Sequence, residues 1–274
     1  MTTTTASSKP WPHSVYSSDP YAGLPMIGNG MTGYILQLDE GCVVKVAKTY
    51  SLDVYVGTPS FDDMEYINEI NVKTLENEVK IYQRLGHYEG IINCLQTSNY
   101  GIELAFAKQG NLEDYIKAEP EPPESLKIEW ILSVIDTLSY AHSQRVLVDE
   151  IAPRNFLVAD GHLKLADFGQ SLLLPISTDM DTVCDNDLTT RIEILHLGWV
   201  IYSIAVWHVH TYYFFDKEHD MQWPNTQELP PAEGLFCKPI VEKCWNGQYI
   251  NMKTLKDEAY KTLVCDRKQS VCCL

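Results

Sequence analysis

Apolar and polar residues alternate in the first third of the chain, and this alternation predicts strands. Residues 34–38 alternate in the manner of a half-buried strand. A turn at residues 39–41 separates them from a second apolar run, residues 42–47, so the two runs predict a hairpin. Residues 91–98 and 102–107 predict two further strands. We therefore expect a small sheet near the start of the chain.

A spacing of three and four residues predicts an amphipathic helix after this hairpin. Its apolar positions are Val72, Leu75, Val79, Tyr82 and Leu85, and the pattern ends at Gly86. The segment before it is expected to be a polar insertion. It contains Gly57, Pro59 and the pair Asp62–Asp63.

The remainder of the chain has a helical character. A proline-rich acidic break at residues 119–123 precedes a long helix, whose predicted apolar stripe is Ile128, Ile131, Leu132, Ile135 and Leu138. Apart from a short hairpin near Asp160–Gly161, helices and loops are expected from there on. Residues 194–215 are apolar, but three histidines interrupt them and an acid stands at each end, so a buried core helix running into a turn is favoured over a membrane span.

Charge and cysteine content narrow the class of protein. The formal net charge of the 274 residues is −16, and such an acidic surface repels nucleic acids and anionic membranes. Eight cysteines without a CxxC pair fit neither a disulfide framework nor a zinc site, which predicts a reducing, cytoplasmic location. Residues 1–20 are rich in Thr, Ser and Pro and are predicted to be a disordered tail rather than a signal peptide.

Three features carry the first chemical signal. Gly28, Gly30 and Gly33 form a GxGxxG pattern followed by a strand rather than a helix, which suits a loop over phosphates between two antiparallel strands. Twelve residues after the last glycine, Lys45 lies in an apolar strand and needs a partner there. Glu78, on the following helix, is the candidate partner. Taken singly, an empty glycine turn, a snorkelling lysine and a solvated glutamate explain these residues as well.

In this order the motifs resemble the protein kinase family. The resemblance runs from about residue 28 to residue 263 and is densest between residues 140 and 171, which contain Asn155 and, twelve residues later, the Asp-Phe-Gly of residues 167–169. It implies an α+β, bilobal protein kinase-like fold, with a small N-lobe of a sheet and one helix and a mainly helical C-lobe. The implied domain covers residues 21–265, with the N-lobe at about 21–105, and leaves a C-terminal tail at 266–274.

The resemblance also implies a role for each matched residue. ATP and Mg²⁺ are the implied cofactors, with Asn155 and Asp167 as metal ligands and Lys45 paired with Glu78 to position phosphates. Arg154, in a catalytic loop closer to the tyrosine-kinase style, is either a cation for the γ-phosphate or a surface arginine. The implied nucleotide contacts are Gly28, Gly30, Gly33, Ile35, Lys45, Leu104, Phe106 and Ala107.

The catalytic loop departs from the family pattern. Counting back five residues from Asn155 places Glu150 where the family has its catalytic aspartate, and the Tyr-Ala-His-Ser of residues 140–143 gives the same register. A register slipped by one residue, with Asp149 pointing inward, is the alternative that the Asn155 spacing disfavours. The added methylene moves the carboxylate by about 1 Å, and such a shift can cost roughly 10²-fold in rate.

Other departures leave the activity open between three readings. The residue directly before Glu150 is Asp149 and not an arginine that could receive a phosphorylated loop. Glu193, which matches the aspartate of the family's central C-lobe helix, follows Asp167 by only 26 positions. The readings are a protein kinase that transfers the γ-phosphate to a protein hydroxyl, perhaps weakly; a pseudokinase that acts as a nucleotide-binding scaffold; and, as a minor alternative, a small-molecule kinase. The expected partner is a protein substrate or scaffold partner, with no nucleic acid and no transmembrane segment.

Several groups are predicted to have no chemical role. His208, His210 and His219 lack Cys or carboxylate neighbours at ligand spacing and are expected to be ordinary buried or surface histidines. Cys244–Trp245 is expected in the core, and Asp179, Asp181, Asp185 and Asp187 in a solvated loop. Cys272 and Cys273 do not form a CaaX box, although a lipid on this pair stays open.

Overall fold

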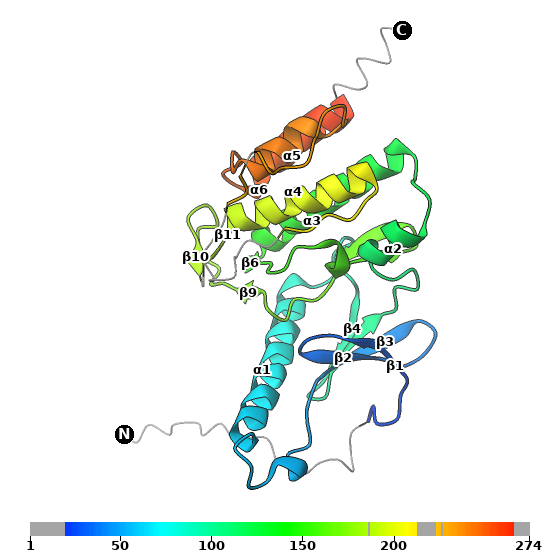
Figure 1. Ribbon diagram of the computed structural model, residues 1–274, viewed down its shortest axis with the longest axis vertical. Helices are drawn as coiled ribbons and strands as arrows, with labels where there is room; N and C mark the ends of the chain where they lie inside the picture. The colour runs from blue at the N-terminus through cyan, green and yellow to red at the C-terminus, as the bar shows by residue number, and fades with distance from the viewer. Residues whose placement is uncertain (1–19, 186, 213–222, 226, 266–274) are drawn as a thin grey trace.

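The structure is a computed structural model that describes residues 20–185, 187–212, 223–225 and 227–265 (Figure 1). The tails predicted at residues 1–20 and 266–274 lie outside the described residues, apart from Pro20, and so do His219, Cys272 and Cys273. None of the described helices combines the length and the apolar character that a bilayer crossing requires.

A five-stranded antiparallel sheet forms the first part of the fold, in the order β1-β2-β3-β5-β4. The predicted hairpin is present, with Lys45 of β3 opposite Ile35 of β2. On its other side β3 pairs with β5, which was predicted from the second pair of apolar runs. The strands are β1 (Met26–Asn29), β2 (Gly33–Gln37), β3 (Cys42–Ala47), β4 (Cys94–Thr97) and β5 (Ile102–Ala105).

A single long helix, α1 (Phe61–Leu85), accompanies the sheet. It ends at Gly86 as predicted, but it begins eleven residues before Val72, after a short 3-10 turn at Asp53–Tyr55. The predicted polar insertion was therefore too long. Asp62 and Asp63 lie in the first helical turn, where carboxylates interact favourably with the helix dipole, so their polarity marks a helix start and not a loop.

Helices dominate the second part, and α3 and α4 form its core. Trp130, Ile131 and Leu138 of α3 are fully buried, and so is most of α4, as expected for the apolar stretch that begins near residue 194. Ile128 and Leu132 are only partly buried. The helices are α2 (Leu112–Ala118), α3 (Glu124–Ser143), α4 (Thr190–Val206), α5 (Lys238–Trp245) and α6 (Met252–Tyr260), followed by a π-helical turn at Lys261–Cys265.

Short strands and loops connect the sheet to the helices. The hairpin predicted near Asp160–Gly161 is present as β7 and β8, but two further strand pairs, β6 with β9 and β10 with β11, were not predicted. Each strand of these two pairs is two residues long, too short to show an alternation. The elements are β6 (Val146–Leu147), a 3-10 turn (Pro153–Asn155), β7 (Phe156–Ala159), β8 (His162–Leu165), β9 (Leu172–Leu173), β10 (Cys184–Asp185) and β11 (Leu188–Thr189).

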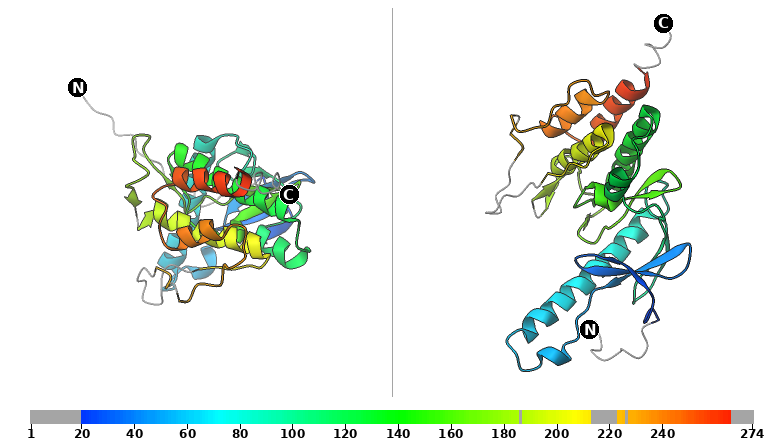
Figure 2. Two further views of the ribbon diagram at one scale, coloured as in Figure 1. Left: turned by 90° about the horizontal axis from the view of Figure 1, so that it is seen from above. Right: turned by 45° about the vertical axis from the view of Figure 1, so that its right-hand side comes forward.

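The whole is an α+β fold of two parts, as predicted. Figure 1 shows the sheet and α1 at one end, the helices α3 to α6 at the other, and the short strands between them. The N-terminal half of α1 continues past the sheet, as the right-hand view of Figure 2 shows. Cys244 and Trp245 lie in the helical core as expected, and the four aspartates of residues 179–187 are exposed.

The close approach of α4 to α5 depends on a glycine. A Cβ added at Gly198 would lie 2.6 Å from the Cβ of Cys244. We expect Gly198→Ala to lower the free energy of unfolding by about 1–3 kcal/mol, because the two helices must move apart. Urea unfolding of this variant beside Gly41→Ala, where the nearest atom lies 3.7 Å away, tests the prediction. Equal stability of the two variants would contradict it.

Candidate functional site

Lys45 lies on one face of the sheet together with other candidate residues. Residues directly opposite each other in antiparallel strands point to the same face, so Ile35 of β2 and Lys45 share it. Val43, two residues before Lys45, is opposite Leu104, so Leu104 shares the face as well. Phe106 and Ala107 follow directly after β5. The sheet thus presents an apolar surface beside one cation.

Two carboxylates converge on Lys45 from different parts of the chain. Its Nζ lies 2.6 Å from Glu78 Oε2 on α1 and 2.8 Å from Asp167 Oδ1, in the segment after β8. Lys45 and Glu78 are buried, whereas the Asp167 side chain is 54% exposed. The predicted pairing of Lys45 with Glu78 is therefore present in the geometry, and Asp167 is the member of the cluster that solvent reaches.

The cluster holds more negative than positive charge, and the pKa directions follow from that. Burial opposes the charge of Lys45, but Glu78 and Asp167 outweigh burial and hold the pKa of Lys45 above its usual value. Burial raises the pKa of Glu78, and the neighbouring Asp167 raises it further against the opposing effect of Lys45. An additional cation beside the exposed Asp167 carboxylate would relieve this excess of negative charge.

The two residues after Asp167 are fixed against α1. Phe168 is fully buried and meets Tyr82 edge-to-face, with ring centroids 5.2 Å apart. Its backbone N–H donates to Glu78 Oε1 over 3.3 Å. A Cβ added at Gly169 would lie 2.6 Å from Cγ2 of Thr74, so a residue without a side chain is required there. Phenylalanine and glycine at these positions thus have a packing role that holds Asp167 toward Lys45.

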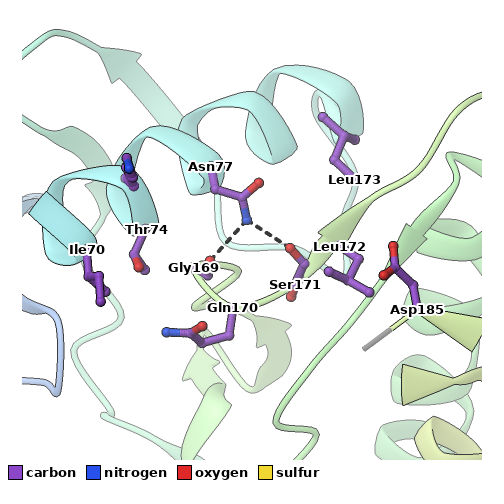
Figure 3. A pocket seen from close by; sticks show the side chains of 10 residues that line it. Ile70, Thr74, Asn77, Gly169, Gln170, Ser171, Leu172, Leu173 and Asp185 are labelled. Atoms are coloured by element: carbon purple, nitrogen blue, oxygen red, sulfur yellow. Dashed lines mark hydrogen bonds between the residues drawn. The ribbon is translucent and has the colours of Figure 1, made fainter. Parts of the chain in front are cut away.

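Asn77, which the sequence did not single out, joins α1 to the same segment. Its Nδ2 donates to the carbonyl oxygens of Gly169 at 3.0 Å and Ser171 at 2.8 Å (Figure 3). Two turns later, Arg84 donates to the carbonyls of Gln144 and Leu174. The sequence offered one indication of its role, which is that Asn77 adjoins Glu78 on a helix predicted to face the site.

The loop between β6 and β7 presents Glu150 and holds Asn155. Asn155 is buried, and its Nδ2 donates to the Glu150 carbonyl at 2.7 Å. Glu150 has a left-handed backbone, with φ 58°, and its side chain is 43% exposed, 3.8 Å from Arg154 at the closest atoms. Asp149 is less exposed, its backbone N–H donates to Ser171 Oγ, and burial raises the pKa of its carboxyl. Glu150 is thus the more accessible of the two acids.

Glu193 of α4 holds this loop from beneath. Its Oε1 accepts from the backbone N–H of Val148 at 2.6 Å, and its Oε2 lies 2.6 Å from His142 Nε2. Both side chains are buried, and each provides the polar partner that the other needs away from water. The sequence placed Glu193 at this structural position but did not predict its contact with His142.

The three glycines of the first hairpin have local reasons for their identity. A Cβ at Gly33 would lie 2.9 Å from the carbonyl oxygen of Val46, and one at Gly28 would lie 3.1 Å from Ile35. A Cβ at Gly30 would lie 3.3 Å from the Gly33 carbonyl oxygen, to which the Gly30 N–H donates. Close packing between the strands therefore accounts for part of the glycine pattern by itself. Across the described residues no group of three or more His, Cys, Asp or Glu side chains is arranged to hold a metal ion.

Comparison with known proteins identifies one family. The family model of the protein kinase domain matches residues 27–190. The chain is 33% identical over 103 residues, 35% of its length, to human receptor-interacting serine/threonine-protein kinase 1. It is 32% identical over 111 residues, 39% of its length, to a probable inactive serine/threonine-protein kinase of Dictyostelium discoideum. Over 250 residues, 84% of its length, it is 24% identical to the tyrosine-protein kinase Abl of Drosophila melanogaster.

These alignments cover only small parts of the relatives. The matched region is 15% of the human protein, 9% of the Dictyostelium protein and 15% of the Drosophila protein. The similarity therefore concerns one domain of much longer chains.

Asn77 is expected to hold the segment that carries Asp167. In Asn77→Ala, the loss of two hydrogen bonds should speed amide hydrogen exchange in residues 169–174 up to about thirtyfold, because each bond contributes about 1 kcal/mol. Asn68→Ala is the matched control, since Asn68 of the same helix makes two hydrogen bonds to the Tyr50 backbone instead. Unchanged exchange in residues 169–174 of Asn77→Ala would show that Asn77 does not hold this segment.

His196 of α4 is expected to limit stability in acid. Burial, and then the cation of Arg154, lower its pKa to about 4. Between pH 6.5 and pH 4 His196 is therefore protonated in the unfolded chain but not in the folded chain, so the free energy of unfolding decreases as the pH falls. The free energy of unfolding, measured by urea titration, should decrease between pH 7 and pH 5. We expect this decrease to be about 1–2 kcal/mol smaller in His196→Gln than in the unsubstituted protein. His162→Gln, at a half-exposed side chain, is the control. An equal loss in all three proteins would refute the role of His196.

Proposed function

Because the chain belongs to the protein kinase family, we propose that it binds ATP with Mg²⁺ and transfers the γ-phosphate slowly to a protein hydroxyl. The observation that carries the proposal is the convergence of Glu78 and Asp167 on Lys45. This arrangement leaves one buried cation aimed at the site and one exposed carboxylate beside it. The proposed domain runs from residue 21 to residue 265, with residues 21–105 as the N-lobe.

The residues present fit a nucleotide-bound Mg²⁺ ion. Asp167 offers an exposed carboxylate, and Asn155 offers its Oδ1 because Nδ2 is used in the loop. Magnesium takes few protein ligands and completes its shell with phosphate and water oxygens, which suits a pair of ligands. When bound, the metal neutralises phosphate charge. Lys45 would hold the phosphates, and Ile35, Leu104, Phe106 and Ala107 would contact the base.

Glu150 is proposed to orient the acceptor and accept its proton. The acceptor oxygen forms a bond to the γ-phosphorus, the bond to the bridging β–γ oxygen breaks, ADP leaves, and the hydroxyl proton passes to Glu150. Phosphoryl transfer depends chiefly on positioning and charge neutralisation, and less on the base. A glutamate displaced by about 1 Å therefore supports slow transfer, at a cost of roughly 10²-fold.

The loop around Glu150 favours a second candidate function. In it the chain is a scaffold that binds nucleotide but does not transfer phosphate. The Glu150 carboxylate lies 3.8 Å from the guanidinium of Arg154, the residue that would otherwise face the γ-phosphate. If this pair persists with nucleotide bound, both residues are diverted from the reaction. One of the relatives is itself named as probably inactive. In this reading Lys45, Asn155 and Asp167 still hold Mg²⁺ and ATP.

Thermal unfolding with ATP, with and without Mg²⁺, tests nucleotide binding. We expect a Mg²⁺-dependent rise in unfolding temperature, because a ligand at 100 times its Kd stabilises by about 2.7 kcal/mol. Asp167→Asn should remove the Mg²⁺-dependent part, while Asp257→Asn, at an exposed ion pair of α6, should keep it. A chain whose unfolding temperature does not respond to ATP and Mg²⁺ would overturn both candidate functions.

Transfer of radiolabelled phosphate to a protein acceptor then separates the two functions. If the chain is a slow kinase, Glu150→Gln should lose the activity and Glu150→Asp should raise it up to about 10²-fold. Transfer that only Glu150→Asp shows would favour the scaffold. Transfer that survives Asp167→Asn would assign the activity to another source.

A further inference from the structure

A groove outside the proposed nucleotide site lies between α1 and the segment after Asp167. Its volume is about 460 Å³. Ile70, Thr74 and Asn77 form one wall, and residues 169–173 with Asp185 form the other, as Figure 3 shows. The proposed nucleotide and metal contacts do not line this groove, so it needs a separate explanation.

The walls of the groove are held at a fixed separation. The two hydrogen bonds of Asn77 cross from α1 to Gly169 and Ser171, and the Ser171 side chain is buried. Leu172 and Leu173 are paired with β6. A site whose shape exists before binding loses little conformational entropy when it is filled, which favours recognition of a partner.

The groove continues into an exposed apolar row on α1. Ile70 is 38% exposed and Tyr66, one turn earlier on the same face, is 64% exposed. Residues 61–70 contain no buried residue, and this half of the helix lies beyond the sheet in Figure 2. Exposed apolar residues beside a preformed groove are typical of a protein interaction surface.

The charge around the groove selects a cationic occupant. Residues 49–72 contain five carboxylates and no Lys, Arg or His, and so do residues 165–190, of which residues 169–173 and Asp185 line the groove. Basic residues stand only at the borders of the two segments, at 48, 73, 164 and 191. The cation in the lining, Lys73, already pairs with Glu69 at 2.6 Å. Asp185 and the other three aspartates of residues 179–187 are exposed.

We propose that this groove binds a cationic amphipathic segment of a partner protein. Apolar side chains of the segment would pack on Tyr66 and Ile70, and its Lys or Arg side chains would pair with Asp185 in the lining. A second copy of this chain fits poorly, because a net charge of −16 on each copy opposes association. Anionic lipid and nucleic acid are repelled for the same reason. Binding in this groove does not depend on phosphate transfer.

Selection from a library of random displayed peptides, against the immobilised full chain, tests the proposal. We expect the enriched peptides to combine at least two basic residues with an apolar pair, and to slow hydrogen exchange in residues 66–77 and 169–173. Their affinity, measured by fluorescence anisotropy, should fall at least tenfold in Tyr66→Ser with Ile70→Ser. It should fall about threefold in Asp185→Asn, with a weaker dependence on salt.

Matched substitutions elsewhere make the test specific. Ile250→Ser, at a side chain 65% exposed on another surface, and Asp257→Asn should leave peptide affinity unchanged. The substituted side chains are exposed, so circular dichroism should report folded variants. The proposal would be overturned if no peptide is enriched, if the enriched peptides lack basic residues, or if the control variants lose affinity equally. Peptide binding that appears only after removal of residues 1–19 would also overturn it, because it would assign the groove to the chain itself. Dimerisation lost in Tyr66→Ser with Ile70→Ser would assign it to a second copy.

Discussion

A buried lysine in the third strand is the constraint on which the rest of the site depends. The Lys45 ammonium is tolerated in an apolar sheet only with carboxylates beside it, and neither neighbour in the sheet, Ile35 or Ile102, supplies one. Glu78 therefore has to come from α1, and Asp167 from the segment after β8. One cation thus ties together three parts of the chain that are far apart in sequence.

Further contacts spread this constraint along α1. Phe168 packs on Tyr82, Asn77 bonds to the carbonyls after Asp167, and Arg84 bonds to the end of the same segment. In this way α1 is held against residues 167–174 by ring packing and by hydrogen bonds to backbone carbonyls. An anion at Asp149 in the loop would repel a phosphate group and not bind it. Of these contacts, the two hydrogen bonds of Asn77 also join the walls of the groove beside α1.

The elements that could be predicted from the sequence were those whose apolar residues repeat with one clear spacing. The strand at residues 42–47 and the helix end at Gly86 follow from alternation, helical spacing and a terminating glycine. The expectation that the helix begins near Val72 was wrong, because the helical turns from Phe61 to Ile70 bury no residue and so no apolar period marks them. The pairing of Lys45 with Glu78 was predictable because a buried charge requires a partner. The hydrogen bonds of Asn77 and the contact of His142 with Glu193 were not, because they depend on how distant segments are packed.

A double-mutant cycle on Lys45 and Glu78 tests this account most directly. The unfolding free energies of the unsubstituted chain, Lys45→Met, Glu78→Gln and the double variant would be measured in urea at one pH. The account predicts that the double variant is no less stable than the worse single variant, with a coupling of at least about 1.5 kcal/mol, because each single change leaves a buried group without its partner. Losses that add to within about 0.5 kcal/mol would contradict it.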